Sequence, residues 1–355
     1  MGLTDFWQGR RVFVTGHTGF KGAWLCLWLE RLGARVSALA LAPETSPSLY
    51  AVLSPWTGAD HHCGDIRDPA GLAARLTRAE PEVVIHLAAQ ALVRRSYADP
   101  TDTYATNVMG TINLLEAVRQ TPSVRTVLAV TSDKVYANDG RGRAFTEPDR
   151  LGGADPYSSS KACAELVCQS YAKSFLQEAG IVLATARAGN VIGGGDWAGD
   201  RLVPDFVRAL DQGVPVQLRY PDATRPWQHV LEPLAGYLAY ARALTEAGAT
   251  GSMPLALNFG PAPQDFATVA ELTEELGRGF GADRSWVRAA GEWQAEAPVL
   301  TLNSALAATA LGWLPRLQRG QAIEWTAAWY RAHRDGADMR EFSLRQIAAY
   351  EEAGA

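Results

Sequence analysis

Tyr157 and Lys161 are the pair of residues whose types and spacing most clearly indicate chemistry. They follow Asp155 and Pro156, which suit the cap and the first turn of a helix, so their side chains are expected one turn apart on one helical face. A free phenol has a pKa of about 10, and a neighbouring ammonium favours the phenolate. Tyr157 is therefore predicted to take a proton from a substrate hydroxyl, as an alcohol requires when it releases a hydride. An isolated Tyr-x-x-x-Lys is usually an ordinary surface pair, so the prediction depends on the surrounding motifs.

A second group, Ser132, Asp133 and Lys134, directly follows the apolar run Thr126–Val130. Ligands of open α/β sheets bind at the carboxyl ends of the strands, which is where these side chains are expected. Ser132 could hydrogen-bond the same hydroxyl as Tyr157. Asp133 and Lys134 add an acid and a base that a simple dehydrogenase does not require. The alternative is an ordinary polar transition from strand to loop.

The elements that must position these groups begin with a strand, a glycine turn and a helix near the N-terminus. A β-branched run at 11–15 stops at the turn 16–22, which has the spacing G-x-x-G-x-x-G. Glycines allow a tight turn and a close approach to a pyrophosphate, and the helix that follows offers free N–H groups to the anion. The segment therefore predicts a dinucleotide site. Its expected contacts are Gly16, Thr18, Gly19, Phe20 and Lys21.

The second expected strand, 35–41, ends without the carboxylate that usually binds the adenosine ribose of NAD, and Glu44 is the first carboxylate after it. Neither Arg nor Lys stands there for a 2′-phosphate, so NAD is the predicted cofactor. Asn107 is either a satisfied buried amide or a residue that shapes the site. The run His-His-Cys at 61–63 lacks a fourth ligand at a familiar spacing, and no metal site is predicted. The further expected cofactor contacts are Asp65, Ile66, Leu87, Ala88, Ala89, Gln90, Asn107, Tyr157 and Lys161.

Apolar strands alternate with helical segments as far as residue 187, which predicts an α/β fold with a doubly wound parallel sheet. The first domain is expected to span 1–188, with 226–262 returning to it. A smaller substrate-binding lobe is expected from 189–225 and 263–318, followed by a helical tail at 319–355. Arg219, Arg225 and His229 lie in or beside that lobe, where arginine forks match phosphate oxygens. Solvated surface arginines are the competing interpretation.

The composition excludes several classes of protein. The chain has 355 residues, 47% of them hydrophobic, and a formal net charge of −5 without any Lys/Arg run, so no nucleic acid is expected as a partner. No apolar segment approaches twenty residues and no signal peptide is evident, so no membrane association is expected. The protein is predicted to be soluble and cytoplasmic. Reduced core thiols are expected for the four cysteines, Cys26, Cys63, Cys163 and Cys168.

Taken together, these motifs resemble the extended short-chain dehydrogenase/reductase family (Rossmann fold), and in particular its CDP-glucose 4,6-dehydratase branch of bacterial deoxysugar biosynthesis. The likeness runs from about Phe6 to Pro315. The Ser-Asp-Lys triplet and the Gly-Gly-Asp-Trp loop are its narrower parts. The motifs that carry it are V14-T-G-H-T-G-F-K-G22, H86-L-A-A-Q90, T131-S-D-K-V-Y136, Y157-S-S-S-K161, R187-A-G-N-V-I-G-G-G-D-W197 and R225-P-W-Q-H-V230.

The resemblance implies an internal redox cycle on CDP-glucose with NAD as cofactor. Tyr157, helped by Lys161 and Ser132, would remove the C4 hydroxyl proton while the C4 hydride passes to NAD. Asp133 would then protonate the departing C6 hydroxyl. Lys134 would act at C5, either as a neutral base or as a charged stabiliser of the enolate. Return of the hydride to C6 gives CDP-4-dehydro-6-deoxyglucose.

The same resemblance implies substrate contacts and a partner. The helices that carry Asn107 and Tyr157 would pair with a second copy, giving a homodimer or a dimer of dimers. Two alternatives stay open at this point: another nucleotide-sugar enzyme, such as a dTDP- or GDP-sugar dehydratase, a 4-epimerase or a 4-ketoreductase, and a cofactor-sensing protein without turnover. The expected substrate contacts are Asn190, Arg201, Arg219, Arg225, His229 and Asn258.

Overall fold

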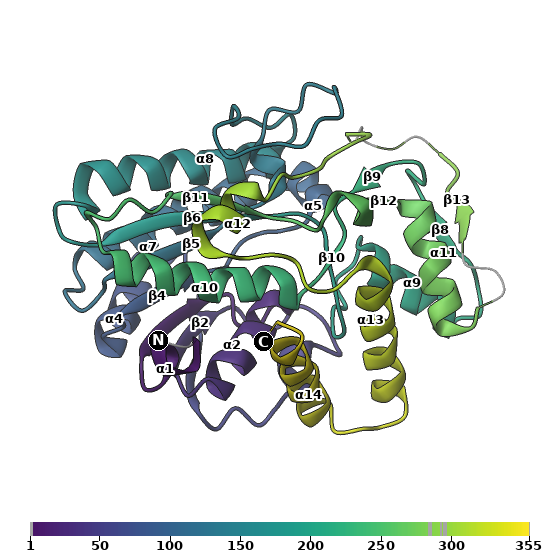
Figure 1. Cartoon of the computed structure of the whole chain (residues 1–355), viewed down its shortest axis with the longest axis horizontal. Helices are drawn as coiled ribbons and strands as arrows, with labels where there is room; N and C mark the ends of the chain where they lie inside the picture. Colours follow the sequence, from purple (N-terminus) through teal and green to yellow (C-terminus); the bar gives the residue numbers. More distant parts are fainter. Residues whose placement is uncertain (1–2, 283–285, 292, 294–296, 355) are drawn as a thin grey trace.

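The computed structural model of the chain describes residues 3–282, 286–291, 293 and 297–354. At its centre is a seven-stranded sheet with the order β11-β6-β5-β4-β1-β2-β3 (Figure 1), and every pairing in it is parallel. The order runs outward from β1 in both directions, so the predicted doubly wound sheet is confirmed. Its strands are β1 (Arg11–Thr15), β2 (Arg35–Ala40), β3 (Ala59–Cys63), β4 (Val83–His86), β5 (Thr126–Val130), β6 (Val182–Ala188) and β11 (Ala256–Phe259).

The central strands are mostly apolar and are buried along their whole length because helices cover both faces of the sheet. All five residues of β5 and all seven of β6 are buried, as expected for parallel strands inside an α/β domain. Strand β3 is different, because it lies at the edge of the sheet and its residues are only partly covered. The prediction of core thiols is therefore wrong for Cys63, which is exposed on β3, although all four cysteines are free.

Two hydrophobic clusters, one on each face, join the sheet to its helices. The first cluster includes α1 (Leu3–Trp7), α2 (Phe20–Arg31), α10 (Leu231–Ala247), α12 (Ala305–Leu311), α13 (Arg319–Arg334) and α14 (Met339–Glu352). The second includes α4 (Pro69–Ala79), α7 (Gly110–Arg119) and α8 (Pro156–Tyr171), which η3 (Ala172–Leu176) extends. Short helices between β2 and α7 are α3 (Leu49–Val52), α5 (Val93–Ala98), α6 (Pro100–Tyr104) and the π-helical turn η1 (Ala105–Met109).

Smaller elements gather beyond the carboxyl ends of the strands, and Figure 1 shows α9, α11, β8 and β13 together at that end of the molecule. The domain boundaries drawn from the sequence stay a prediction. The elements are η2 (Asp133–Val135), β7 (Val191–Ile192), α9 (Leu202–Asp211), β8 (Val216–Leu218), β9 (Thr224–Arg225), β10 (Gln228–His229), η4 (Pro263–Asp265), β12 (Ala267–Thr268), α11 (Val269–Phe280) and β13 (Trp286–Arg288).

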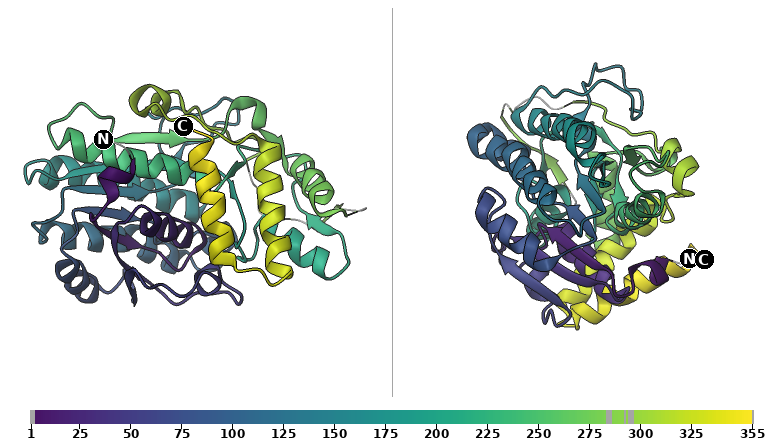
Figure 2. Two further views of the ribbon diagram at one scale, coloured as in Figure 1. Left: turned by 60° about the horizontal axis from the view of Figure 1, so that its bottom comes forward. Right: turned by 90° about the vertical axis from the view of Figure 1, so that its left-hand side faces the viewer.

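The last helix, α14, returns to the first part of the chain, as the turned view in Figure 2 shows, and α13 packs beside it. Helix α14 contacts α2 through polar groups: Trp28 Nε1 donates to Glu351 at 2.8 Å, and Arg340 pairs with Glu30 at 2.5 Å. The N- and C-terminal segments are thereby fastened together. Among the residues that the structure describes, no helix has the length and apolar character needed to cross a bilayer.

Candidate active site

A cavity of about 600 Å³ opens where the carboxyl ends of the central strands face the smaller elements. Most of the residues predicted from the sequence line it. They are Gly16, Thr18, Gly19, Phe20, Lys21, Asp65, Ile66, Leu87, Ala88, Ala89, Gln90, Ser132, Asp133, Lys134, Tyr157, Lys161, Asn190, Arg201, Arg219 and Arg225. Three predicted residues, Asn107, His229 and Asn258, are buried elsewhere.

The glycine turn forms a cradle that side chains would fill. Gly16 has φ +82°, and a Cβ there would lie 2.7 Å from the backbone nitrogen of Ala88. A Cβ at Gly22 would lie 2.1 Å from the carbonyl oxygen of Gly16, so the helix can pack this closely only with glycine. Gly19 caps α2 without a side-chain hydrogen bond, which leaves the N–H groups of the first turn available. The turn therefore fits the pyrophosphate of a dinucleotide.

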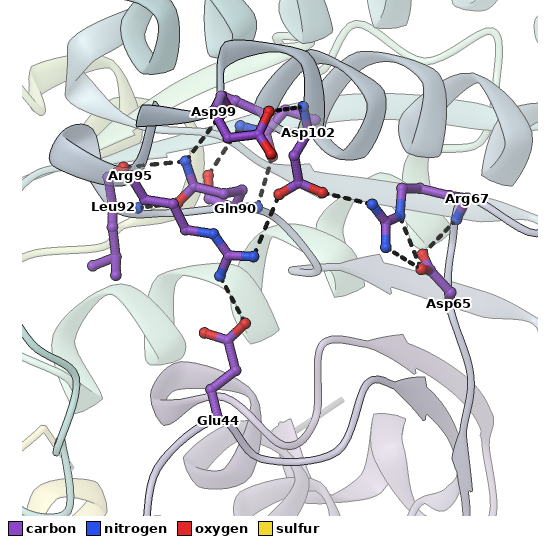
Figure 3. A network of polar contacts seen from close by, with 10 residues as sticks. Glu44, Asp65, Arg67, Gln90, Leu92, Arg95, Asp99 and Asp102 are labelled. Carbon is purple, nitrogen blue, oxygen red and sulfur yellow. Dashed lines mark hydrogen bonds and ion pairs between the residues drawn. The ribbon is translucent and has the colours of Figure 1, made fainter. Parts of the chain in front are cut away.

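Arginine–carboxylate pairs surround the far end of the cradle (Figure 3). Arg67 contacts Asp65 at 2.6 Å and Asp102 at 2.5 Å, and Arg95 contacts Glu44 at 2.8 Å. The hydrogen bond from Arg67 lowers the pKa of Asp65. The sequence predicts no arginine near this position, whereas the fold brings two there. Both guanidinium groups are already paired with carboxylates.

Asn107 holds the loop beneath the cavity instead of lining it. Its side chain accepts from the Gln90 backbone N–H at 2.8 Å, and donates to the Gln90 carbonyl at 3.0 Å and to Ser160 Oγ at 2.9 Å. The π-helical turn η1 carries it to this place, and such turns often occur at functional sites. Asn107 is therefore a satisfied buried amide, one of the two interpretations offered by the sequence. We assign it the role of positioning the Gln90 loop.

Helix α8 positions Tyr157 and Lys161 as predicted, with Asp155 capping the helix through a 2.9 Å bond from the Ser158 N–H. Both side chains are buried at the cavity wall. The expectation that the ammonium would favour the phenolate is wrong in this state: burial raises the pKa of Tyr157 to about 12, with only partial relief from a hydrogen bond with Ser132. Lys161 Nζ instead donates to the Val130 carbonyl at 3.3 Å, and burial lowers the pKa of this lysine to about 8.

The strand tip after β5 forms one turn of 3-10 helix, η2, that carries Asp133 and Lys134. Ser132 Oγ accepts from the Lys134 N–H at 3.2 Å and donates to Asp133 Oδ1 at 3.0 Å. Asp133 is 2% exposed, and its Oδ2 has no hydrogen-bond partner among the described residues. Burial raises the pKa of Asp133 despite the positive charge of Lys134. A buried carboxyl group with a free oxygen suits a proton donor.

Lys21 adds a further cation to the cavity wall. Burial lowers its pKa to about 7, and Arg201 and Lys161 add to this effect while Asp133 opposes it. Its ammonium lies 5.9 Å from the centre of the Tyr237 ring. Lys21 is thus close enough to Asp133 and to Lys161 to interact with both electrostatically, and it also lies beside the glycine cradle.

Arginines line the opposite wall. Arg201 pairs with Asp196 at 2.9 Å, and Asp200 accepts from Arg219 at 3.1 Å and from Arg94 at 2.6 Å. Sequence reasoning missed Arg94, although the Arg-Arg doublet that begins four residues after Gln90 was a usable signal. Arg94 and Arg219 share the single carboxylate of Asp200, so this group keeps a net positive charge and suits an anionic ligand.

The loop that holds Arg201 depends on α13. The Trp329 ring covers Gly194 so closely that a Cβ there would lie 2.0 Å from Trp329 Cγ. Tyr330 Oη donates to the Asp196 carbonyl at 2.5 Å. The helix therefore supports, from behind, the loop that lines this part of the cavity.

His229 and Asn258 lie in the core. The His229 ring is fully buried between Trp24 and Trp325, and its Nδ1 accepts from the Leu231 N–H at 3.3 Å. Burial lowers the pKa of His229 to about 3, so it is neutral. The Asn258 side chain bonds Tyr136, Phe145 and Asn303. We assign neither residue a contact with substrate.

The NAD dependent epimerase/dehydratase family model matches residues 12–253 of the chain. The chain belongs to this family. Among curated members, the CDP-glucose 4,6-dehydratase of Salmonella typhimurium is 45% identical over 98% of this chain and 97% of its own. The dTDP-glucose 4,6-dehydratase of Streptomyces griseus is 30% identical over 91% and 94%.

Solved members of the family share the whole architecture. The dTDP-glucose 4,6-dehydratase DesIV of Streptomyces venezuelae, a double mutant solved with NAD and DAU bound, superposes with a TM-score of 0.79 at 26% identity and covers 93% of this chain and 99% of that chain. A UDP-glucose 4-epimerase of Thermotoga maritima also reaches 0.79, at 21% identity over 91% and 99%. The family fold thus serves more than one reaction, and the site residues must distinguish them.

Proposed function

We propose that this chain is an NAD-dependent CDP-glucose 4,6-dehydratase, a hydro-lyase that forms CDP-4-dehydro-6-deoxyglucose. The observation that carries the proposal is Asp133, a buried carboxyl group beside the Tyr157 site, one oxygen of which has no partner among the described residues. An epimerase or a ketoreductase has no leaving hydroxyl to protonate and would leave this group unexplained. The 45% identity to a CDP-glucose 4,6-dehydratase over almost the whole chain supports the same reaction and the same substrate.

NAD fits the cradle at Gly16, Gly19 and Gly22, where the close backbone approach and the open N-terminus of α2 suit a pyrophosphate. When bound, it supplies the hydride acceptor and then the hydride donor that a redox-neutral dehydration needs. The pairing of Arg67 and Arg95 with carboxylates favours a ribose without a 2′-phosphate.

In the oxidation, Tyr157 receives the proton of the C4 hydroxyl, and Ser132 hydrogen-bonds the same oxygen. Because burial holds the Tyr157 pKa near 12, the residue needs support to act as a base at neutral pH. The hydrogen bond with Ser132 and the positive charge of Arg201 both lower the Tyr157 pKa and provide that support.

In the dehydration, Asp133 protonates the departing C6 hydroxyl. Burial raises its pKa, so a larger fraction of Asp133 carries the proton near neutral pH than an exposed carboxylate would. Lys134, next to it on η2, acts at C5, either by removing the proton or by stabilising the enolate with its charge. The C4 ketone makes that proton acidic.

The remaining assignments concern the substrate and the assembly. Asn190, Arg201, Arg219 and Arg225 are proposed to hold the nucleotide diphosphate, because they line the wall opposite the cradle. A homodimer through η1 and α8 remains a prediction. It is supported by the large apolar side chains exposed on α6, η1, α8 and η3, which are Tyr104, Met109, Leu166 and Phe175. Location in the cytoplasm also remains a prediction from the sequence.

Incubation of the purified protein with CDP-, dTDP-, GDP- and UDP-glucose tests the proposal. We expect CDP-glucose to lose one water and to give a 4-keto product that absorbs in alkali, at a rate at least about tenfold above the other sugars. Mass spectrometry of the nucleotide released from denatured protein identifies the cofactor. A C4 epimer formed without loss of water would replace the dehydratase with an epimerase, and absence of turnover on all four sugars would reject the proposal.

A further inference from the structure

A buried ion pair that the proposed mechanism does not use lies beneath the catalytic groups. Arg187 on β6 and Glu165 on α8 are 1% and 0% exposed and pair bidentately, with Nε–Oε1 at 2.9 Å and Nη2–Oε2 at 2.6 Å. Buried ion pairs often add little to stability, because desolvation offsets the attraction, and well-packed apolar residues can replace them. The pair therefore calls for an explanation other than stability.

The pair contacts both ends of the catalytic segment 132–134. On one side, Thr131 Oγ1 donates to Glu165 Oε1 at 2.5 Å. On the other side, Arg187 Nη1 donates to Tyr136 Oη at 2.9 Å. The short segment that carries Asp133 and Lys134 thus runs between two residues bound to one ion pair.

Tyr136 is itself fixed from its outer side. Its hydroxyl donates to Asn258 Oδ1 at 2.7 Å, and its ring stacks on Phe145 with centroids 4.9 Å apart. Asn258 is anchored in turn by a 2.8 Å bond from its N–H to Glu147. This arrangement gives Asn258 a role without any contact to substrate.

Glu165 also belongs to the helix that carries the other catalytic pair. Tyr157, Lys161 and Glu165 are spaced four residues apart and lie along one face of α8. The charge of Glu165 raises the pKa of Lys161 against the effect of burial. One carboxylate therefore connects the helix of Tyr157 with the strand tip of Asp133.

We propose that Glu165 and Arg187 are positioning residues for the dehydration step, holding segment 132–134 in register with Tyr157 through Thr131 and Tyr136. The inference rests on the proposed function. Small displacements of a catalytic group lower rates strongly, because proton transfer requires hydrogen-bond distance. Loosening either contact should therefore slow the chemical steps and spare substrate binding.

Two matched pairs of variants test this role while leaving the ion pair intact. Thr131→Val and Thr185→Val each remove one hydroxyl that donates to Glu165, but only Thr131 adjoins the catalytic segment. Tyr136→Phe and Tyr240→Phe each remove one buried hydroxyl, and among the described residues that of Tyr240 donates to the Pro254 carbonyl and not to the catalytic segment.

We expect Thr131→Val and Tyr136→Phe to lower kcat by about tenfold or more, with KM and CDP affinity within about twofold of wild type. Both should also release, up to one equivalent per bound NAD, a 4-keto sugar that still carries its C6 hydroxyl, detected by mass, with the cofactor left as NADH. The controls, Thr185→Val and Tyr240→Phe, should lose similar thermal stability and keep wild-type kcat.

Equal kcat within each matched pair would overturn the positioning role, because the hydroxyls would then contribute to stability alone. A rise in KM without a fall in kcat would also overturn it. Wild-type protein separates this failure from failure of the proposed function: a wild type that does not dehydrate CDP-glucose rejects the function, whereas an active wild type with indistinguishable variants rejects only the positioning.

Discussion

The two catalytic pairs are held in different ways, and of their four side chains only that of Lys134 is half-buried and not fully buried. Tyr157 and Lys161 sit one turn apart on a sixteen-residue helix, whose backbone sets their spacing. Asp133 and Lys134 lie on a three-residue 3-10 turn, which is too short to fix the positions of their side chains by itself. Contacts from side chains on other elements, Glu165 on α8 and Arg187 on β6, hold this turn in place. The geometry of the first pair is thus local, and that of the second depends on long-range contacts.

This difference indicates how one fold supports several reactions. A pair fixed by helix periodicity is kept whenever the helix is kept, so it serves any reaction that begins with oxidation of an alcohol. A pair at a strand tip can be exchanged without disturbing the sheet, and it decides which step comes after the oxidation. Substitutions in the helix pair and in the strand-tip pair should therefore have separable effects.

The largest effect is expected for Tyr157→Phe. Loss of the hydroxyl that receives the C4 proton should lower kcat by about 10²–10⁴-fold, with CDP still bound. Mass spectrometry should detect neither the 4-keto-6-deoxy product nor the 4-keto intermediate that still carries its C6 hydroxyl. Tyr171→Phe is the control, because Tyr171 lies on the same helix but bonds Glu116 at the surface. Substantial turnover by Tyr157→Phe would remove the helix pair from the mechanism.

Asp133→Asn should separate the two pairs most clearly. The amide cannot protonate the leaving hydroxyl, so dehydration should slow by about 10²-fold, while C4 oxidation still occurs once per bound NAD and leaves NADH. The expected signature is a 4-keto sugar that retains its C6 hydroxyl. Asp139→Asn, in the exposed loop after η2, should behave as wild type. If Asp133→Asn loses oxidation as well, the two pairs do not act separately.

Lys161→Met tests the cost of burying the helix pair. The folded-state pKa of about 8 lies below the ordinary 10.5, so at a pH between these values the unfolded chain binds a proton that the folded chain does not. Wild-type stability should therefore rise relative to the variant between about pH 8 and 10.5, and the penalty should be complete below pH 8. We expect a change on the order of 1–3 kcal/mol in chemical unfolding. A difference independent of pH would contradict the buried cation.

The smallest effect is expected for Asp155→Ala, which removes the cap of α8. It should cost about 1 kcal/mol of stability and change kcat by less than about threefold, because the rest of the helix still sets the Tyr157–Lys161 spacing. Asp338→Ala removes the equivalent cap of α14, far from the cavity, and is the matched control. A much larger loss of kcat in Asp155→Ala than in Asp338→Ala would show that the helix pair also relies on single contacts.

The same contrast explains what could be predicted from the sequence. Strands β1 and β5 have the predicted bounds, and α8 begins at Pro156 behind its Asp155 cap, because these features follow from local residue patterns. The raised pKa of Tyr157 could not be predicted, because burial depends on the whole fold. The same holds for the core position of His229.

The positioning pair left signals in the sequence that were not used. Glu165 continues the four-residue spacing of Tyr157 and Lys161, and Arg187 is a lone charge in an apolar strand. A charge in such a strand requires a partner when it is buried. The sequence could not show that this partner is Glu165.

The packing of α13 on the 194–196 loop has a consequence for how the protein is made. Trp329 and Tyr330 are translated more than a hundred residues after Gly194 and Asp196, yet they support the loop that leads to Arg201 in the cavity wall. A growing polypeptide can therefore assemble its sheet and its nucleotide cradle on the ribosome, but not a finished sugar pocket. Catalytic competence should appear only after the last helices have left the exit tunnel.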